Sequence, residues 1–273
     1  SEAVGGLINI ITKNNLSAPK LAIDGFSTSW GEYNLDLASK LNIGSKTNVL
    51  LGLNYFNFSN TIDNNNDNFT DLTLQNRISV FQKWNFQRKN ERIFSIAGRF
   101  FYEDRWGGEL QWTPAFRGGD SIYGESIYTR RFELLGKYQL PVKEKMMFSY
   151  SYTDHDQNSV YGNSYYLAKQ RIGFSQDEIA FSKKHSLLLG LRYDYDKRHG
   201  SIYTPRAAYR WKMTDNDIIR LNLGTGFRVV NLFTEEHAAL TGSREVVIAE
   251  ELKPEQSFNL NLNYLKKIYS DNG

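Results

Sequence analysis

A two-residue alternation of apolar and polar side chains returns along most of this chain, and it limits the possible folds more than any other feature. It is clear in residues 186–196, where one face reads Leu187, Leu189, Leu191, Tyr193 and Tyr195, and the other reads Leu188, Gly190, Arg192, Asp194 and Asp196. Successive side chains of a β-strand point to opposite faces. The segment is therefore predicted to be a strand with one apolar and one polar face.

The composition indicates where the apolar face points. The mean hydropathy is −0.53, although 14% of the residues are aromatic. No apolar run reaches the roughly 18 residues of a membrane helix. A polar chain with many such alternating segments is typical of a barrel whose outside contacts lipid. We therefore predict an all-β fold, an antiparallel transmembrane β-barrel.

The number and length of these segments support a membrane barrel. About twelve segments alternate, and many exceed the roughly 9–11 residues that cross a bilayer at a tilt. Strands of soluble proteins are nearer about 5–6 residues. Any one segment fits a half-buried strand of a soluble sheet equally well, whereas the whole series favours the barrel.

Short and long connections alternate between the predicted strands. Outer-membrane barrels have short periplasmic turns and long extracellular loops. The short turns are predicted at 44–46, 88–90, 142–145, 183–185 and 214–217, and the long loops at 59–70, 104–123, 156–164, 197–204 and 229–255. Aromatic belts are expected at the two interfaces, the outer of Tyr55, Phe56, Tyr152, Tyr193 and Tyr195 and the inner of Trp84, Tyr138, Phe181 and Trp211.

The first residues do not follow the alternation. The Gly5-Gly6 pair allows a tight turn, and 7–11 is a short β-branched strand with apolar residues on both faces. This stretch resembles the end of the plug domain of TonB-dependent outer-membrane receptors. The residues that carry the resemblance are Gly5, Gly6, Asn9, Thr12 and Lys13. It implies two parts, with 1–19 as the end of a plug domain and 20–273 as a partial outer-membrane β-barrel.

A second resemblance to the same family lies far along the chain. Its residues are Gly226, Phe227, Arg228, Asn231, Pro254 and Glu255. The chain departs from the family pattern at Val230 and at Glu250-Glu251. Barrels of this family have about 22 strands around a plug. The resemblance thus implies a fragment with about half of the wall, without the TonB box, and an open curved sheet would agree with this.

The resemblance also implies a function. Such receptors actively import a scarce, large nutrient across the bacterial outer membrane, here a ferric siderophore, haem or cobalamin rather than a polysaccharide. The implied partners are outer-membrane lipid and the TonB–ExbB–ExbD system, which acts on the plug. A passive porin-like or adhesin barrel is the first alternative. A secreted all-β binding protein is the second.

Other chemistry finds little support in the sequence. Lys and Arg (33) nearly balance Asp and Glu (30), which argues against a nucleic-acid partner. The chain has no Cys, and its four His lack zinc spacing. Asp154-His155-Asp156 and the Asn/Asp-rich 63–68 are interpreted as solvated segments. We expect no metal, no cofactor and no catalytic residues, and therefore no enzyme.

The best candidates for ligand binding are aromatic and arginine side chains in two predicted outer loops. Aromatic faces together with Arg suit a bulky, partly anionic ligand. The candidates are Arg105, Trp106, Trp112, Phe116, Arg117, Tyr123, Tyr161, Tyr165 and Tyr166. The alternative is that these rings belong to an interface belt or to the packing of the loops themselves.

Overall fold

The described part of the chain forms a single antiparallel sheet of twelve strands, as predicted. The computed structural model describes residues 18–142, 145–229 and 253–268, so the plug motif of residues 1–13 and Asn231 lie outside the described residues. Each strand pairs with the next in sequence order. The strands are β1 (Leu21–Ser27), β2 (Glu32–Ile43), β3 (Thr47–Phe58), β4 (Leu74–Phe86), β5 (Phe94–Gly108), β6 (Gly124–Gln139), β7 (Lys145–Tyr161), β8 (Ser164–Ala180), β9 (His185–Asp196), β10 (Gly200–Lys212), β11 (Asp217–Arg228) and β12 (Glu255–Lys266).

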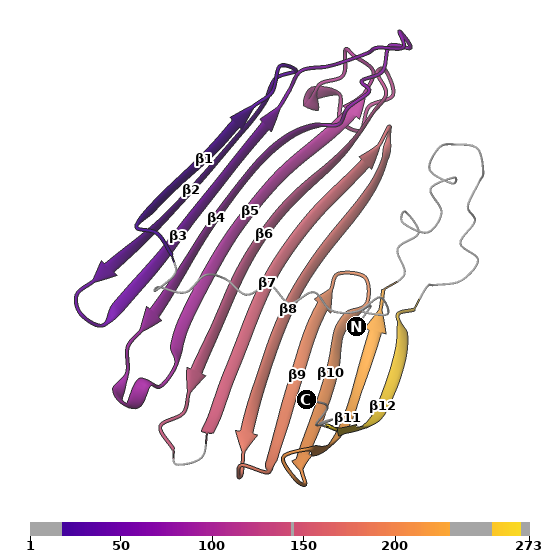
Figure 1. Cartoon of the computed structure of the whole chain (residues 1–273). Coiled ribbons are helices and arrows are strands. Elements are labelled where there is room, and N and C mark those ends of the chain that lie inside the picture. Colours follow the sequence, from indigo (N-terminus) through magenta and orange to yellow (C-terminus); the bar gives the residue numbers. More distant parts are fainter. Residues whose placement is uncertain (1–17, 143–144, 230–252, 269–273) are drawn as a thin grey trace.

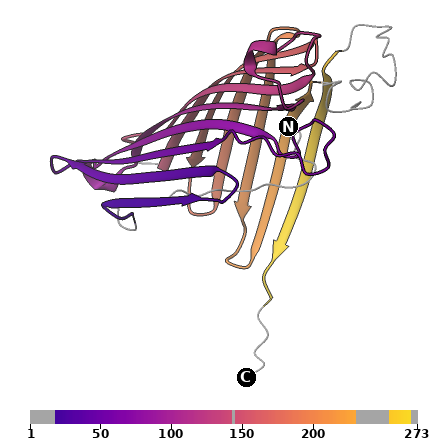
Figure 2. The same ribbon diagram turned by 90° about the horizontal axis from the view of Figure 1, so that it is seen from above.

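The sheet is curved and open. Figure 2 shows it curling from β1 round to β12 without closing. In the described residues the sheet order begins at β1 and ends at β12, and these two strands do not pair. Two short 3-10 helices, Lys89–Glu91 and Pro114–Phe116, lie in the connections. In the part of the chain described here, no helix is long and apolar enough to span a membrane.

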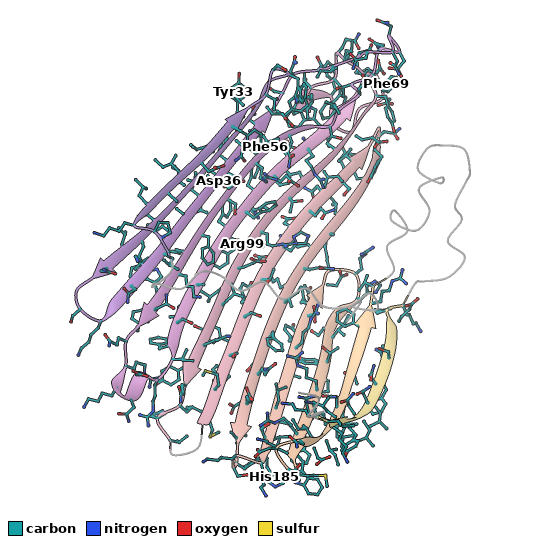
Figure 3. All side chains as sticks on the ribbon, viewed as in Figure 1. Tyr33, Asp36, Phe56, Phe69, Arg99 and His185 are labelled. Atoms are coloured by element: carbon teal, nitrogen blue, oxygen red, sulfur yellow. The ribbon has the colours of Figure 1, made fainter. Side chains whose placement is uncertain are left out.

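The connections define two ends, which we name the turn end and the loop end. The turn end carries the short links 44–46, 87–93, 140–144, 181–184 and 213–216, at the positions predicted. The loop end carries 28–31, 59–73, 109–123, 162–163 and 197–199, together with the end of β11 and the start of β12. In Figure 3, Phe69 labels the loop end and His185 the turn end.

Two of the predicted long loops are wrong. β7 runs to Tyr161 and β8 begins at Ser164, so only a tight turn replaces the loop predicted at 156–164. Likewise only 197–199 separate β9 from β10. The loop predicted from Asp104 begins later, because β5 continues to Gly108. These segments are mostly polar and therefore show little alternation, yet strand pairing continues through them.

The register separates the residues into two faces of the sheet. Directly paired residues of antiparallel strands share a face. One row across six strands is apolar throughout, and we call its side the apolar face: Ile23, Leu37, Leu53, Val80, Phe100 and Phe132. The opposite side, which we call the charged face, carries a connected polar network. There Arg99 contacts Glu133 at 2.6 Å, and Asn54 donates to Asp36 at 2.8 Å.

Phe56 departs from the predicted outer belt. It lies on the charged face, one residue out of step with Tyr55, and the guanidinium of Arg77 sits 5.1 Å from its ring centroid. The ring is therefore a platform for a cation on this face. Figure 3 labels Phe56, Asp36 and Arg99 along the middle of the sheet.

Aromatic rings gather at the turn end of the apolar face. Phe86 stacks on Phe94 at 4.6 Å, and Phe94 meets Tyr138 edge-on at 5.4 Å. Further along the sheet, His185 stacks with both Tyr209 and Trp211 at 6.0 Å. A band of this kind is characteristic of membrane interfaces.

The apolar face changes character towards the loop end of the middle strands. The row that runs through Phe132 continues into Asp154 and Arg171. The neighbouring row runs from Tyr102 through Arg130 and Asp156 to Lys169. Figure 1 shows that β5–β8 extend further at this end than β9–β12. The middle strands therefore carry a projecting part on which the apolar rows give way to charged residues.

Candidate functional site

The register divides the predicted ligand residues between the two faces at the loop end. Arg105 and Tyr161 lie on the charged face, in line with Ile127 and Glu125. Trp106 belongs to the opposite face, where it pairs with Leu74 and Ser126. The sequence marked these residues as candidates but could not show that neighbours in the chain would separate in this way.

A groove of about 440 Å³ brings together four of the nine candidates, namely Arg105, Trp106, Tyr123 and Tyr161. Its walls come from β5, β6 and β7 and from the links 59–73 and 109–123. The guanidinium of Arg105 and the rings of Tyr123 and Tyr161 therefore converge on a space at the loop end, whereas Trp106 borders this space from a position whose side chain belongs to the opposite face. Other residues that border it are Phe69, Thr70, Thr73, Gly107, Gly108, Glu125, Ser126 and Ile127.

Polar contacts fix the groove side chains. The Tyr123 hydroxyl donates to Glu125 at 2.7 Å, and the Tyr123 backbone N–H donates to Glu109 at 2.8 Å. Arg105 contacts Glu103 at 3.0 Å. Burial, with the hydrogen bond to Glu125 second, raises the pKa of Tyr123 to about 12. This phenol therefore stays a neutral hydrogen-bond donor at physiological pH.

Phe69 is the groove residue that the sequence reading missed. Its ring lies 6.3 Å from that of Tyr123. The Asn/Asp-rich link holds it there, because the Leu110 N–H donates to the Asn68 carbonyl at 2.9 Å and the side chains of Asn68 and Gln111 are hydrogen-bonded. A single aromatic residue within a polar segment was the available signal.

Three other candidates, Trp112, Arg117 and Tyr165, form a packed cluster outside the groove. Arg117 contacts both carboxylate oxygens of Asp104, at 2.8 and 2.7 Å. Trp112 is only 5% exposed, and a methyl group on Gly124 would collide with its ring. The Tyr165 hydroxyl donates to the Arg117 carbonyl.

Asp104 and Gly124 lie on the same face of the sheet as Trp106. This cluster therefore holds the 109–123 link against the apolar-face side of the projecting strands. Arg117 is already engaged by a carboxylate there. Phe116 ends the short helix Pro114–Phe116 and is 36% exposed. Tyr166 lies in β8 opposite Ser159, and its side chain is outside the described part of the structure. The roles predicted for all nine residues remain predictions.

The motif near the end of the chain lies at the loop end of the β11–β12 strand pair. In the register Arg228 faces Glu255 and Gly226 faces Ser257. The Arg228 and Glu255 side chains lie 3.9 Å apart, and the Arg192 guanidinium is 5.5 Å from the Phe227 ring. Pro254 directly precedes β12, where its missing N–H costs no ladder bond.

Metal-binding geometry is absent from the described residues. No group of three or more His, Asp or Glu side chains there is placed to hold an ion. In the Asn/Asp-rich link, Asp63 instead accepts backbone N–H groups from Asn66 and Asn68.

Comparisons with known proteins identify the family. A model of the β-barrel of TonB-dependent receptor-like proteins matches residues 11–273. The chain therefore belongs to this family of bacterial outer-membrane receptors, which is a receptor family and not an enzyme family. The resemblance seen in the sequence is confirmed.

The relatives and structural neighbours agree with this assignment. The "Iron-regulated outer membrane virulence protein" of Vibrio cholerae serotype O1 is 29% identical over 117 residues, which cover 42% of this chain and 18% of that protein. The siderophore receptor PirA of Pseudomonas aeruginosa superposes with a TM-score of 0.59 at 13% identity, over 90% of this chain and 45% of the receptor. The copper transporter OprC gives 0.55 at 12% identity, over 86% and 42%. The chain thus spans less than half the length of these proteins.

Proposed function

We propose that this chain is part of the barrel wall of a receptor that actively imports a ferric siderophore. The observation that carries the proposal is the groove at the loop end, where Arg105, Tyr123 and Tyr161 converge on the charged face. Ferric siderophores are bulky and often anionic, which suits stacking rings and a guanidinium. The iron-regulated relative and the siderophore-receptor neighbours support the same cargo class.

The orientation in the membrane follows from the lengths of the connections. Links 59–73 and 109–123 are the long ones among those described. Because long loops of such barrels are extracellular, we assign the loop end to the outside. The groove then meets the ligand before the interior of the barrel does. Energy would come from the TonB–ExbB–ExbD system acting on the plug.

Ligand binding to the full-length receptor tests the groove. Arg105→Ala and Tyr123→Ala should each weaken binding of the cognate ferric siderophore by about tenfold, the size of one lost charge-assisted bond or stacking contact. Arg220→Ala is the matched control, since Arg220 lies on the charged face near the turn end. Unchanged affinity in both groove variants, or equal losses in the control, would contradict the assignment.

Haem or cobalamin is the alternative cargo, and a passive barrel is the alternative mechanism. A panel of ferric siderophores, haem and cobalamin in a binding assay separates the ligands. Uptake into cells after collapse of the proton-motive force separates the mechanisms, because active import should stop and passive diffusion should continue.

A further inference from the structure

Four cations gather where the apolar face becomes polar, and we name them the outward basic cluster: Arg130, Lys169, Arg171 and Lys197. Arg130 lies on β6, and Lys169 and Arg171 lie on β8. Lys197 directly follows β9, whose last residue Asp196 pairs with Gln170 beside Lys169. Strands β6, β7 and β8 are neighbours in the sheet, and Lys197 lies at the end of the next strand, β9. The pairing of these strands thus brings the four cations together.

The register places the cluster on the lipid side of the wall. Arg130 pairs directly with Tyr102, and the same row runs through Leu35, Tyr55 and Ile78. Arg171 follows the row through Phe100 and Phe132. The cluster therefore lies on the face opposite the ligand groove and cannot contribute to it.

The acidic residues between these cations hold them only loosely. Arg130 lies 3.6 Å from Asp156 and Arg171 lies 3.9 Å from Asp154, one contact in each case. The two arginine side chains remain 57% and 53% exposed. Four cations against two carboxylates leave two surplus positive charges. In the described structure Lys169 and Lys197 make no ion pair.

Tyrosine rings mark the level of the cluster relative to the bilayer. Tyr195 is the direct neighbour of Arg171 in its row, and Tyr152 lies one step closer to the turn end than Asp154. The ring of Tyr203 packs tilted against that of Tyr193, with the centroids 5.1 Å apart, and Tyr203 is 62% exposed. Tyrosine belts lie at headgroup depth, so the cluster sits at the depth of lipid phosphates.

We propose that the outward basic cluster binds the phosphate groups of an anionic headgroup in the outer leaflet, of the phosphorylated-glycolipid class. Guanidinium groups bind phosphate bidentately and ammonium groups bind it as point charges. A phosphate can also replace a carboxylate partner held by a single contact. The proposal rests on the assignment of the loop end to the outside, and it does not depend on the imported cargo.

Lipid retention by the full-length receptor tests the proposal. The receptor is reconstituted in phosphatidylcholine nanodiscs doped with lipid A, and bound lipid A is counted by native mass spectrometry. Each basic residue near an anionic surface is worth about fivefold in binding. The variant Arg130→Gln/Lys169→Gln/Arg171→Gln should therefore lower lipid A retention by at least tenfold, whereas Arg130→Lys/Arg171→Lys should retain it.

The matched control removes the same charge from the other face. Lys137→Gln/Arg210→Gln/Arg220→Gln lie on the charged face of β6, β10 and β11, and should leave retention unchanged. Asp154→Asn/Asp156→Asn should increase it. Equal losses in cluster and control variants, or no loss in either, would overturn the proposal. So would displacement of lipid A by equimolar inorganic phosphate, because the site would then select a free ion and not a headgroup.

Cargo binding separates this proposal from the proposed function. The cluster variants should bind the ferric siderophore normally, since they lie on the face opposite the groove. A loss of lipid A with intact siderophore binding supports the cluster. A loss of siderophore binding with intact lipid A would instead contradict the division into two faces.

Discussion

The lower part of the middle strands, near the turn end, and their upper part, near the loop end, carry different side chains although their backbone geometry is the same. Towards the turn end, the apolar face of β7 presents Phe148, Tyr150 and Tyr152. The next two residues on the same face beyond Tyr152 are Asp154 and Asp156. Strand pairing continues without interruption across this change. The change in side chains therefore reflects a change in what surrounds the strand, and not a change in its backbone geometry.

The tilt of the strands explains why the change occurs where it does. Strands of membrane barrels are tilted by about 35–45°, so a row of directly paired residues also climbs through the bilayer. The row through Leu53, Val80, Phe100 and Phe132 is apolar, and it turns charged at β7. The upper boundary of the lipid therefore crosses this row between β6 and β7.

The largest effect should come from a charge placed in the lower part. Phe100→Arg introduces a cation on the lipid side, which should destabilise the barrel by up to about 4 kcal/mol. Asn158→Arg is the matched control, because Asn158 lies on the same face in the projecting part of β7. It should cost almost nothing. Urea unfolding in lipid vesicles measures both, and similar costs would mean that the boundary is misplaced.

The packed cluster of the upper part gives the next effect. Trp112→Ala removes a 5% exposed ring and should destabilise the 109–123 link locally by about 3 kcal/mol. Phe116→Ala, which truncates a 36% exposed ring of the same link, should have little effect. Hydrogen exchange of the link reports the difference. Equal protection in both variants would show that Trp112 does not hold the loop.

The ion pairs of the upper part should contribute far less. Asp156→Asn removes the partner of an Arg130 side chain that is 57% exposed. Exposed pairs are typically worth about 0–1 kcal/mol, so unfolding in urea should shift only slightly. A cost near that of Trp112→Ala would show that the projecting strands depend on charge pairing.

The titration of Tyr123 gives the smallest effect. Burial first, and the hydrogen bond to Glu125 second, raise its pKa to about 12. Any stability from this shift is complete below the ordinary pKa of Tyr and is lost as the pH rises through about 12. Glu125→Gln should lower the pKa, although burial should keep it above the ordinary value. Ultraviolet difference spectra measure this, and an unchanged titration would contradict the contact.

The alternation predicted much of the fold from the sequence. It placed twelve strands, their antiparallel order and the turns at the turn end, because a period of two is a local property of an extended chain beside lipid. It failed at 156–164 and 197–204, where loops were predicted and strands were found. Most residues there are polar, so the alternation is interrupted although strand pairing continues.

The candidate site was only partly predictable for a related reason. Composition drew attention to the arginines and aromatic residues of 104–123. It could not show that Arg105 and Tyr123 meet in a groove with Phe69, or that Arg117 is bound by Asp104. These relations depend on strand register and on contacts between two separate links.

The sequence alone therefore determined that the chain forms a sheet with one lipid-compatible face, and its motifs indicated the receptor family. Only the tertiary structure decided which side chains share a face at the loop end and where the lipid face stops. The physical reason is that alternation is set by each strand separately. Register and tilt are set by pairing between strands, and a shift of one residue moves every side chain to the other face.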